Sequence, residues 1–246
     1  MFDESLNYQF SVFNTQHFIT LAVLITILVL FIVFKKYFKE PKSDRIFRYS
    51  LATLMLVAEV SFHIWVLSRG EYGWDMIPFT GFCATTNLFT IIALYTNNHK
   101  IASVTIYYSF VGAFFALMFA DITYGFPHFR YFGFFIVHFG FLLGNLHFFL
   151  QDKLNLNRKY VTITMILMAS QALILLGLDL IFSKNWFYFI ESPVKEVSDF
   201  FGSPWYSILW FITIGLMVEG SYQLLRFLKK PTAHSSKAPK QTLKDA

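Results

Sequence analysis

The chain has 246 residues, of which 56% are hydrophobic and 20% aromatic, while only 14% are charged. A soluble domain carries about 25% charged residues and less apolar mass, so the composition excludes an ordinary soluble protein. The formal net charge of +5 does not indicate nucleic-acid binding, because the basic residues flank apolar runs and do not form one basic segment.

Seven apolar runs approach the roughly 20 residues that a membrane-spanning helix needs. In chain order they cover residues 18–38, 46–68, 75–96, 101–121, 130–150, 160–182 and 204–227. Each run is continuously apolar, which favours helices over the alternating strands of a membrane barrel. We therefore predict an all-α polytopic bundle of about seven transmembrane helices over residues 18–227. An N-terminal segment (1–17) would precede it, and a basic, disordered tail (228–246) would follow it.

Lys and Arg residues are distributed unevenly between the two sides of this bundle. Sixteen lie in the first, third and fifth connections and in the tail, and four lie in the remaining connections. By the positive-inside rule the N-terminus is outside and the C-terminus is cytoplasmic. The single Cys cannot form an intramolecular disulfide.

Ionisable residues inside membrane spans are costly and therefore point to function. Glu59 and His63 are four residues apart, so they share a face of the second span. By the same spacing Cys83 and Asn87 share a face of the third span. The predicted topology gathers most of these polar residues in the outer half of the bundle.

Cys83 and His138 are predicted at the same depth, roughly 10–12 Å below the outer end, from the rise of 1.5 Å per residue. A His at the depth of a thiol can act as its base. The pair predicts a thiol nucleophile with an imidazole as its base, and Asp121 or Glu59 could orient the imidazole. Asn87 is a candidate donor to the oxyanion.

Two other functions stay open at this point. In a transporter of a small solute or proton, polar residues would line a path on both sides of the midplane: Glu59, His63, Asp121, His138 and Asp179. In a non-catalytic scaffold, polar residues would only join helices to one another. A metal site built from His63, His128, His138 and Asp121 has no HExxH or CxxC spacing to support it, so we expect no metal and no cofactor.

Several motifs carry a resemblance to a known family: PFTGFC in the third span, GAFFALMFAD in the fourth, FPHFRYFGFFIVH into the fifth, and NWFYFIESP and FGSPWYSI before the seventh. Over about residues 45–226 the chain resembles the YwaF-type bacterial integral membrane family. That family is related to transmembrane protein 164 of animals and more distantly to androgen-induced membrane hydrolases. The resemblance implies a seven-helix core and a multi-pass protein of the bacterial plasma membrane.

The animal relative resembles a phospholipid acyltransferase with a Cys nucleophile and a His. Carried over by motif, these roles fall on Cys83 and His138. The family pattern Pro-Leu-His-Leu-Cys is PFTGFC here, which adds one residue and lacks the His. If Pro78 is the anchor of the motif, Thr80 takes the place of that His, and a hydroxyl nucleophile becomes the alternative. The expected partners are membrane lipids.

The stretch DITYGFPHFRYFGFFIVH joins the fourth and fifth spans. We expect residues 121–130 to form a short outer turn, with Arg130 reaching the headgroups by snorkelling. His128 would be an interfacial loop residue, whereas His138 would be carried down to the depth of Cys83.

Overall fold

The computed structural model describes residues 9–73, 81–183, 185, 189–190, 195–202 and 204–229. In these residues the regular elements are helices, and one isolated β-bridge pairs Gln9 with Tyr124. The helices are α1 (Thr15–Val33), the 3₁₀ helix η1 (Tyr37–Lys39), α2 (Pro41–Ser68), α3 (Phe82–Thr96), α4 (His99–Met118), α5 (Phe129–Leu150), α6 (Arg158–Phe182), α7 (Lys195–Phe201) and α8 (Trp205–Leu228).

The predicted all-α polytopic architecture is confirmed. Six of the described helices are long and apolar enough to cross a membrane: α1, α2, α4, α5, α6 and α8. The predicted span 75–96 contains the shorter apolar helix α3, and residues 75–80 lie outside the described part. Residues 1–8 and 230–246, in the predicted N-terminal segment and tail, also lie outside it.

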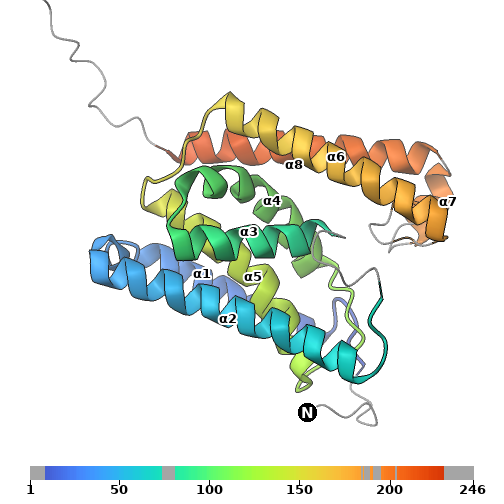
Figure 1. Cartoon of the computed structure of the whole chain (residues 1–246), viewed down its shortest axis with the longest axis horizontal. Coiled ribbons are helices and arrows are strands. Elements are labelled where there is room, and N and C mark those ends of the chain that lie inside the picture. Colours follow the sequence, from blue (N-terminus) through green and yellow to red (C-terminus); the bar gives the residue numbers. More distant parts are fainter. Residues whose placement is uncertain are drawn as a thin grey trace, which may run out of the picture.

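Successive long helices run in alternating directions along the bundle (Figure 1). α1 and α2 form one side, α3 and α4 lie in the middle, and α6 and α8 form the opposite side, with α5 crossing between them (Figure 1). α4 packs against α3, α5, α6 and α8, which makes it the central helix. Most of α4 is therefore buried, whereas α1 exposes most of its apolar side chains, as a lipid-facing helix does. Only one face of α1 packs against the core, through Leu21, Leu24, Leu28 and Phe31.

Several helices begin or end at capping residues that hydropathy does not reveal. α1 begins three residues before the predicted span because the Asn14 side chain accepts a hydrogen bond from the His17 backbone N–H. α2 begins five residues early because the Glu40 carboxylate accepts from the N–H groups of Lys42 and Ser43. These bonds, that of Ser43 first, lower the pKa of Glu40.

Two glycines on one face of α5 allow it to pack closely against α2 and α3. A Cβ added at Gly140 would lie 2.8 Å from Cγ of Met55, and one at Gly144 would lie 3.0 Å from side-chain atoms of Leu94 and Thr90. Such contacts are too short for a real methyl group without rearrangement. The spacing of four residues is that of small-residue interfaces between membrane helices.

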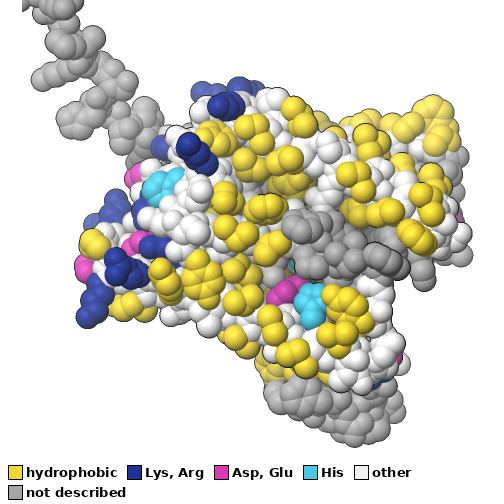
Figure 2. Space-filling view, in the orientation of Figure 1, with side chains coloured by type: hydrophobic (Ala, Val, Ile, Leu, Met, Phe, Trp, Pro, Cys, Tyr) yellow, Lys and Arg dark blue, Asp and Glu magenta, His cyan; other side chains and the backbone are white. Residues whose placement is uncertain are grey.

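Basic side chains gather at one end of the bundle. In the space-filling view, Lys and Arg cluster at the left, where α1 ends and α2, α4 and α6 begin, and the rest of this face is mainly apolar (Figure 2). We call this the basic end. The positive-inside rule predicts that it faces the cytoplasm.

Candidate functional site

A cavity of about 430 Å³ lies between α3, α4, α5 and α8, toward the end of the bundle opposite the basic end. Its wall is mainly apolar and includes aromatic side chains such as Phe115 of α4 and Trp210 of α8. Three side chains that could take part in a reaction also line it: Cys83, His138 and Asp121. We call it the Cys83 cavity.

Cys83 is the second residue of α3, which follows Gly81 as its N-cap. The thiol is the only one in the chain, and the side chain is half-buried. Its Sγ atom lies 3.5 Å from the position that a Cβ on Gly112 would occupy, so the missing side chain of Gly112 leaves room beside the sulfur. The sulfur therefore lies close to the surface of α4.

His138 is held by the carbonyl of its own helix. Nδ1 lies 2.8 Å from the Phe134 carbonyl oxygen, and since a carbonyl only accepts, Nδ1 is the donor. In the neutral ring this leaves the lone pair on Nε2, the form in which an imidazole takes a proton. The ring also packs against Phe134 and Phe141, at centroid distances of 4.2 and 5.5 Å, which restrict its orientation.

The thiol and the imidazole lie on different walls of one cavity, and Phe141 lies near both. A Cβ added to Gly112 would lie 3.5 Å from the cysteine sulfur and 3.5 Å from the ring of Phe141, which in turn packs against His138. Among the contacts of the described residues, no hydrogen bond joins Sγ to the imidazole.

The remaining predicted residues divide into two groups. Asp121 follows α4 and lines the Cys83 cavity. Asn87, Glu59 and His63 form a separate polar chain between α3 and α2. The Asn87 amide donates to Glu59 Oε2 at 3.0 Å, and His63 Nε2 lies 3.3 Å from Glu59 Oε1. Asn87 lies four residues after Cys83 on α3, so these polar contacts begin one helical turn from the cysteine. Thr80 lies outside the described residues.

A short turn joins α4 to α5, as expected, and Arg130 lies in the first turn of α5. His128 is buried, and its side chain caps α5 by accepting from the Arg130 backbone N–H. The Arg130 guanidinium lies over the ring of Phe62 on α2, with Cζ 3.7 Å from its centroid. His128 thus stabilises the start of α5. Arg130 joins α5 to α2, because an aromatic ring provides a favourable site for the guanidinium.

The four residues considered for a metal site do not meet. His63 pairs with Glu59, His128 caps α5, and His138 lines the Cys83 cavity. Over the described ranges, no three His, Cys, Asp or Glu side chains are grouped so that they could hold a metal ion.

The five residues considered for a transport path do not all line one cavity. Of its five residues, Asp121 and His138 line the Cys83 cavity, while Glu59 and His63 bind one another. Asp179 is buried on α6.

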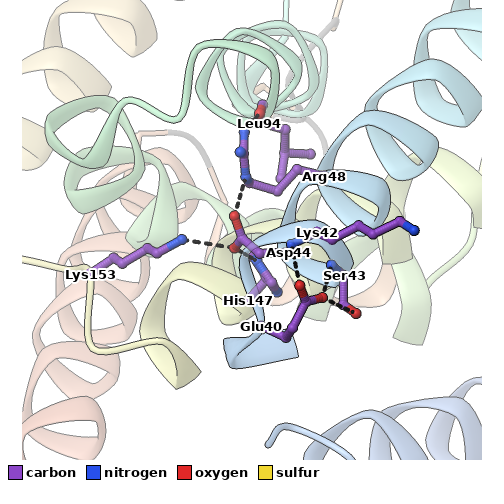
Figure 3. A network of polar contacts seen from close by, with 8 residues as sticks. All are labelled: Glu40, Lys42, Ser43, Asp44, Arg48, Leu94, His147 and Lys153. Carbon is purple, nitrogen blue, oxygen red and sulfur yellow. Dashed lines mark hydrogen bonds and ion pairs between the residues drawn. The ribbon is translucent and has the colours of Figure 1, made fainter. Parts of the chain in front are cut away.

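A polar network at the basic end was not anticipated from the sequence (Figure 3). Asp44 Oδ1 accepts from His147 Nε2 and Lys153 Nζ, both at 2.8 Å, and Oδ2 accepts from Arg48 Nε at 3.0 Å. Arg48 also donates to the Leu94 carbonyl of α3. The network joins α2, α3, α5 and the residues after α5, which indicates a structural role.

A second network lies in the middle of the bundle, around Asn145 of α5. Its side chain accepts from Thr105 at 2.6 Å and donates to Thr90 at 2.8 Å and to Ser109 at 2.6 Å. All four residues are buried. Because these groups satisfy one another, the network ties α3, α4 and α5 together.

Comparison with known proteins supports the resemblance seen in the sequence. A model described as the TMEM164 family matches residues 12–220, which is most of the chain. No curated protein and no solved structure gives a significant match. The bacterial YwaF-type branch stays a prediction. The chain belongs to the TMEM164 family of helical membrane proteins.

Proposed function

We propose that this chain transfers acyl groups of membrane phospholipids, with Cys83 as nucleophile and His138 as general base. The observation that carries the proposal is that the only thiol of the chain and an imidazole in the proton-accepting form line one apolar cavity. Neither side chain is needed to complete the polar networks around Asp44 and Asn145.

The cavity suits an acyl ester better than a polar solute. Its volume of about 430 Å³ is within the range of roughly 300–1,000 Å³ typical of small-molecule sites. Its walls are mainly hydrocarbon and aromatic, and its polar groups are few. An acyl chain would lie against the aromatic walls and bring its ester carbonyl to the thiol.

The chemistry proceeds in two balanced steps. His138 Nε2 takes the thiol proton, and the Cys83 sulfur attacks the ester carbonyl carbon. The bond from this carbon to the ester oxygen then breaks, and the lysolipid leaves with the proton from His138. In the second step His138 takes a proton from an acceptor hydroxyl, whose oxygen attacks the thioester. The new ester leaves, and the thiol recovers its proton.

The position of Cys83 in the first turn of α3 favours this reaction. The first N–H groups of a helix have no partner within it, and the helix dipole is positive there. These groups would stabilise negative charge on the sulfur and on the tetrahedral oxygen. Asn87 is less suited to the oxyanion role predicted for it, because its amide already donates to Glu59. Asp121 lines the same cavity and is the candidate to position the acceptor, because the Phe134 carbonyl already accepts from Nδ1 of His138 and takes the orienting role predicted for Asp121 or Glu59.

The proposed place of action is the outer leaflet of the bacterial plasma membrane. The Cys83 cavity lies toward the end opposite the basic residues, and the basic end is predicted to be cytoplasmic. This location combines the predicted topology with the bacterial resemblance.

The test is acyl release from a labelled phospholipid by the purified full chain in lipid, for wild type, Cys83→Ala and His138→Ala. We expect at least a 100-fold loss of turnover in both variants, because each removes a group that acts in the reacting complex. His99→Gln serves as a matched control, since His99 begins α4 at the opposite end and does not line the cavity. Size-exclusion chromatography checks that every variant is folded.

Two results would overturn the proposal. Undiminished turnover in Cys83→Ala would exclude the thiol as nucleophile and direct attention to a hydroxyl. No turnover by wild type across several phospholipid classes and acceptors would exclude acyl transfer and leave transport or a scaffold role.

A further inference from the structure

A second apolar cavity, of about 750 Å³, runs between α3, α4 and α6. We call it the α4–α6 groove and define it by three residues of α4 and three of α6: Lys100, Val104, Tyr108, Lys159, Leu167 and Gln171. It shares no lining residue with the Cys83 cavity.

The groove begins between two lysines at the basic end. Lys100 lies in the first turn of α4, Lys159 lies in the first turn of α6, and both are exposed. Within the described ranges neither has an ion-pair partner, whereas the neighbouring Lys153 binds Asp44 and Arg158 binds Glu219. The mouth of the groove thus carries two positive charges without internal compensation.

Beyond the lysines the groove is lined mainly by hydrocarbon. It follows α6 from Lys159 to Leu175, a length of about 24 Å at 1.5 Å per residue. At depth, Gln171 donates to Thr85 Oγ1 at 2.7 Å, so these polar groups satisfy one another and present little polarity to the groove. The length exceeds half of the roughly 30 Å hydrocarbon core of a bilayer, so it accommodates a full acyl chain.

We infer that the α4–α6 groove binds one anionic phospholipid from the leaflet at the basic end. Its phosphate lies between Lys100 and Lys159, and one of its acyl chains lies along α4 and α6. Two uncompensated ammonium groups at the headgroup level complement an anionic headgroup, and the apolar walls complement a chain that continues along the bilayer normal. The inference does not depend on the chemistry at Cys83.

The headgroup contact is tested by native mass spectrometry of the purified full chain with phosphatidylglycerol and phosphatidylcholine of identical chains. The double variant Lys100→Gln/Lys159→Gln is expected to lose at least five-fold in phosphatidylglycerol affinity, with phosphatidylcholine unchanged. The control, Lys36→Gln/Lys39→Gln, removes the same charge from exposed lysines near the end of α1, away from the groove. An equal loss in both double variants would overturn the inference, because it would indicate only general attraction to the basic end.

The chain contact is tested with the lysines left in place. Val104→Trp fills the groove and is expected to reduce phosphatidylglycerol binding at least five-fold. Leu173→Trp on the exposed face of α6 lies outside the groove and is expected to have no effect. Unchanged binding in Val104→Trp, or a lipid-free dimer as the main species of wild type, would overturn the inference, the latter by showing a second copy as the occupant.

Discussion

At the residue scale, Asp44 is a buried carboxylate that pairs with residues from several parts of the chain. Its carboxylate accepts from Arg48 and Lys153, two cations, and from His147, and the residue is 8% exposed (Figure 3). Removing one member of a buried ion pair is more destabilising than the net contribution of the pair, because a charge is left without compensation.

Asp44→Asn is therefore expected to destabilise the chain by about 3 kcal/mol and to lower its thermal midpoint in detergent. Glu219→Gln is the control. It breaks an ion pair with Arg158 whose side chains are 33% and 60% exposed, and exposed pairs contribute little. Equal midpoints for the two variants would show that the Asp44 network is not a determinant of stability.

The sequence predicts residues within one helix better than contacts between helices. Glu59 with His63 followed from a spacing of four, and the structure shows their contact. The same spacing joins Asp44 to Arg48, but the other donors to this carboxylate, His147 and Lys153, are 103 and 109 residues away. Arg48 and Lys153 contribute to the positive-inside count, which does not show that they share a buried partner.

At the element scale, the close packing of α5 on α2 requires a glycine at position 140. Gly140→Ala gains helix propensity of up to about 1 kcal/mol, but its methyl group would lie 2.8 Å from Cγ of Met55. Overpacking of this kind destabilises by about 1–3 kcal/mol, so the clash outweighs the gain.

We expect Gly140→Ala to have a lower thermal midpoint than wild type. Gly133→Ala, on the same helix with nothing within 4 Å of the added Cβ, is expected to match or exceed wild type. Midpoints measured for both in one detergent provide the comparison. A Gly140→Ala midpoint at or above that of Gly133→Ala would contradict the close packing of α5 on α2.

Hydropathy predicts the membrane-buried part of each helix more closely than it predicts the helix ends. α2 already includes Lys42 and Arg45, because it begins directly after its cap Glu40, although charged side chains are unfavourable in the hydrocarbon core. In contrast, α4 ends at Met118, three residues before the predicted limit, so Asp121 lies beyond the helix and in the wall of the Cys83 cavity. Capping and local turns determine these limits, and they depend on single side chains.

At the scale of the whole molecule, the uneven distribution of charge predicts the orientation in the membrane. In a Cys83→Ala background, Lys39→Cys introduces a single thiol at the basic end, and Glu71→Cys introduces one after α2 at the other end. Both positions are exposed.

An impermeant maleimide added to intact cells is expected to label Glu71→Cys and to label Lys39→Cys only after lysis. The opposite pattern would invert the topology and would place the Cys83 cavity toward the cytoplasm. Labelling of both after lysis shows that each thiol is reactive.

The position of α1 has a consequence for synthesis. His17 donates from Nε2 to the carbonyl of Leu117, 100 residues later, and α1 packs against α5. At about 5–20 residues per second, the first helix leaves the ribosome roughly 5–20 seconds before its partners exist. Most of its apolar side chains stay exposed in the finished bundle and only one face packs against it, so α1 can remain in the bilayer as an independent helix until then.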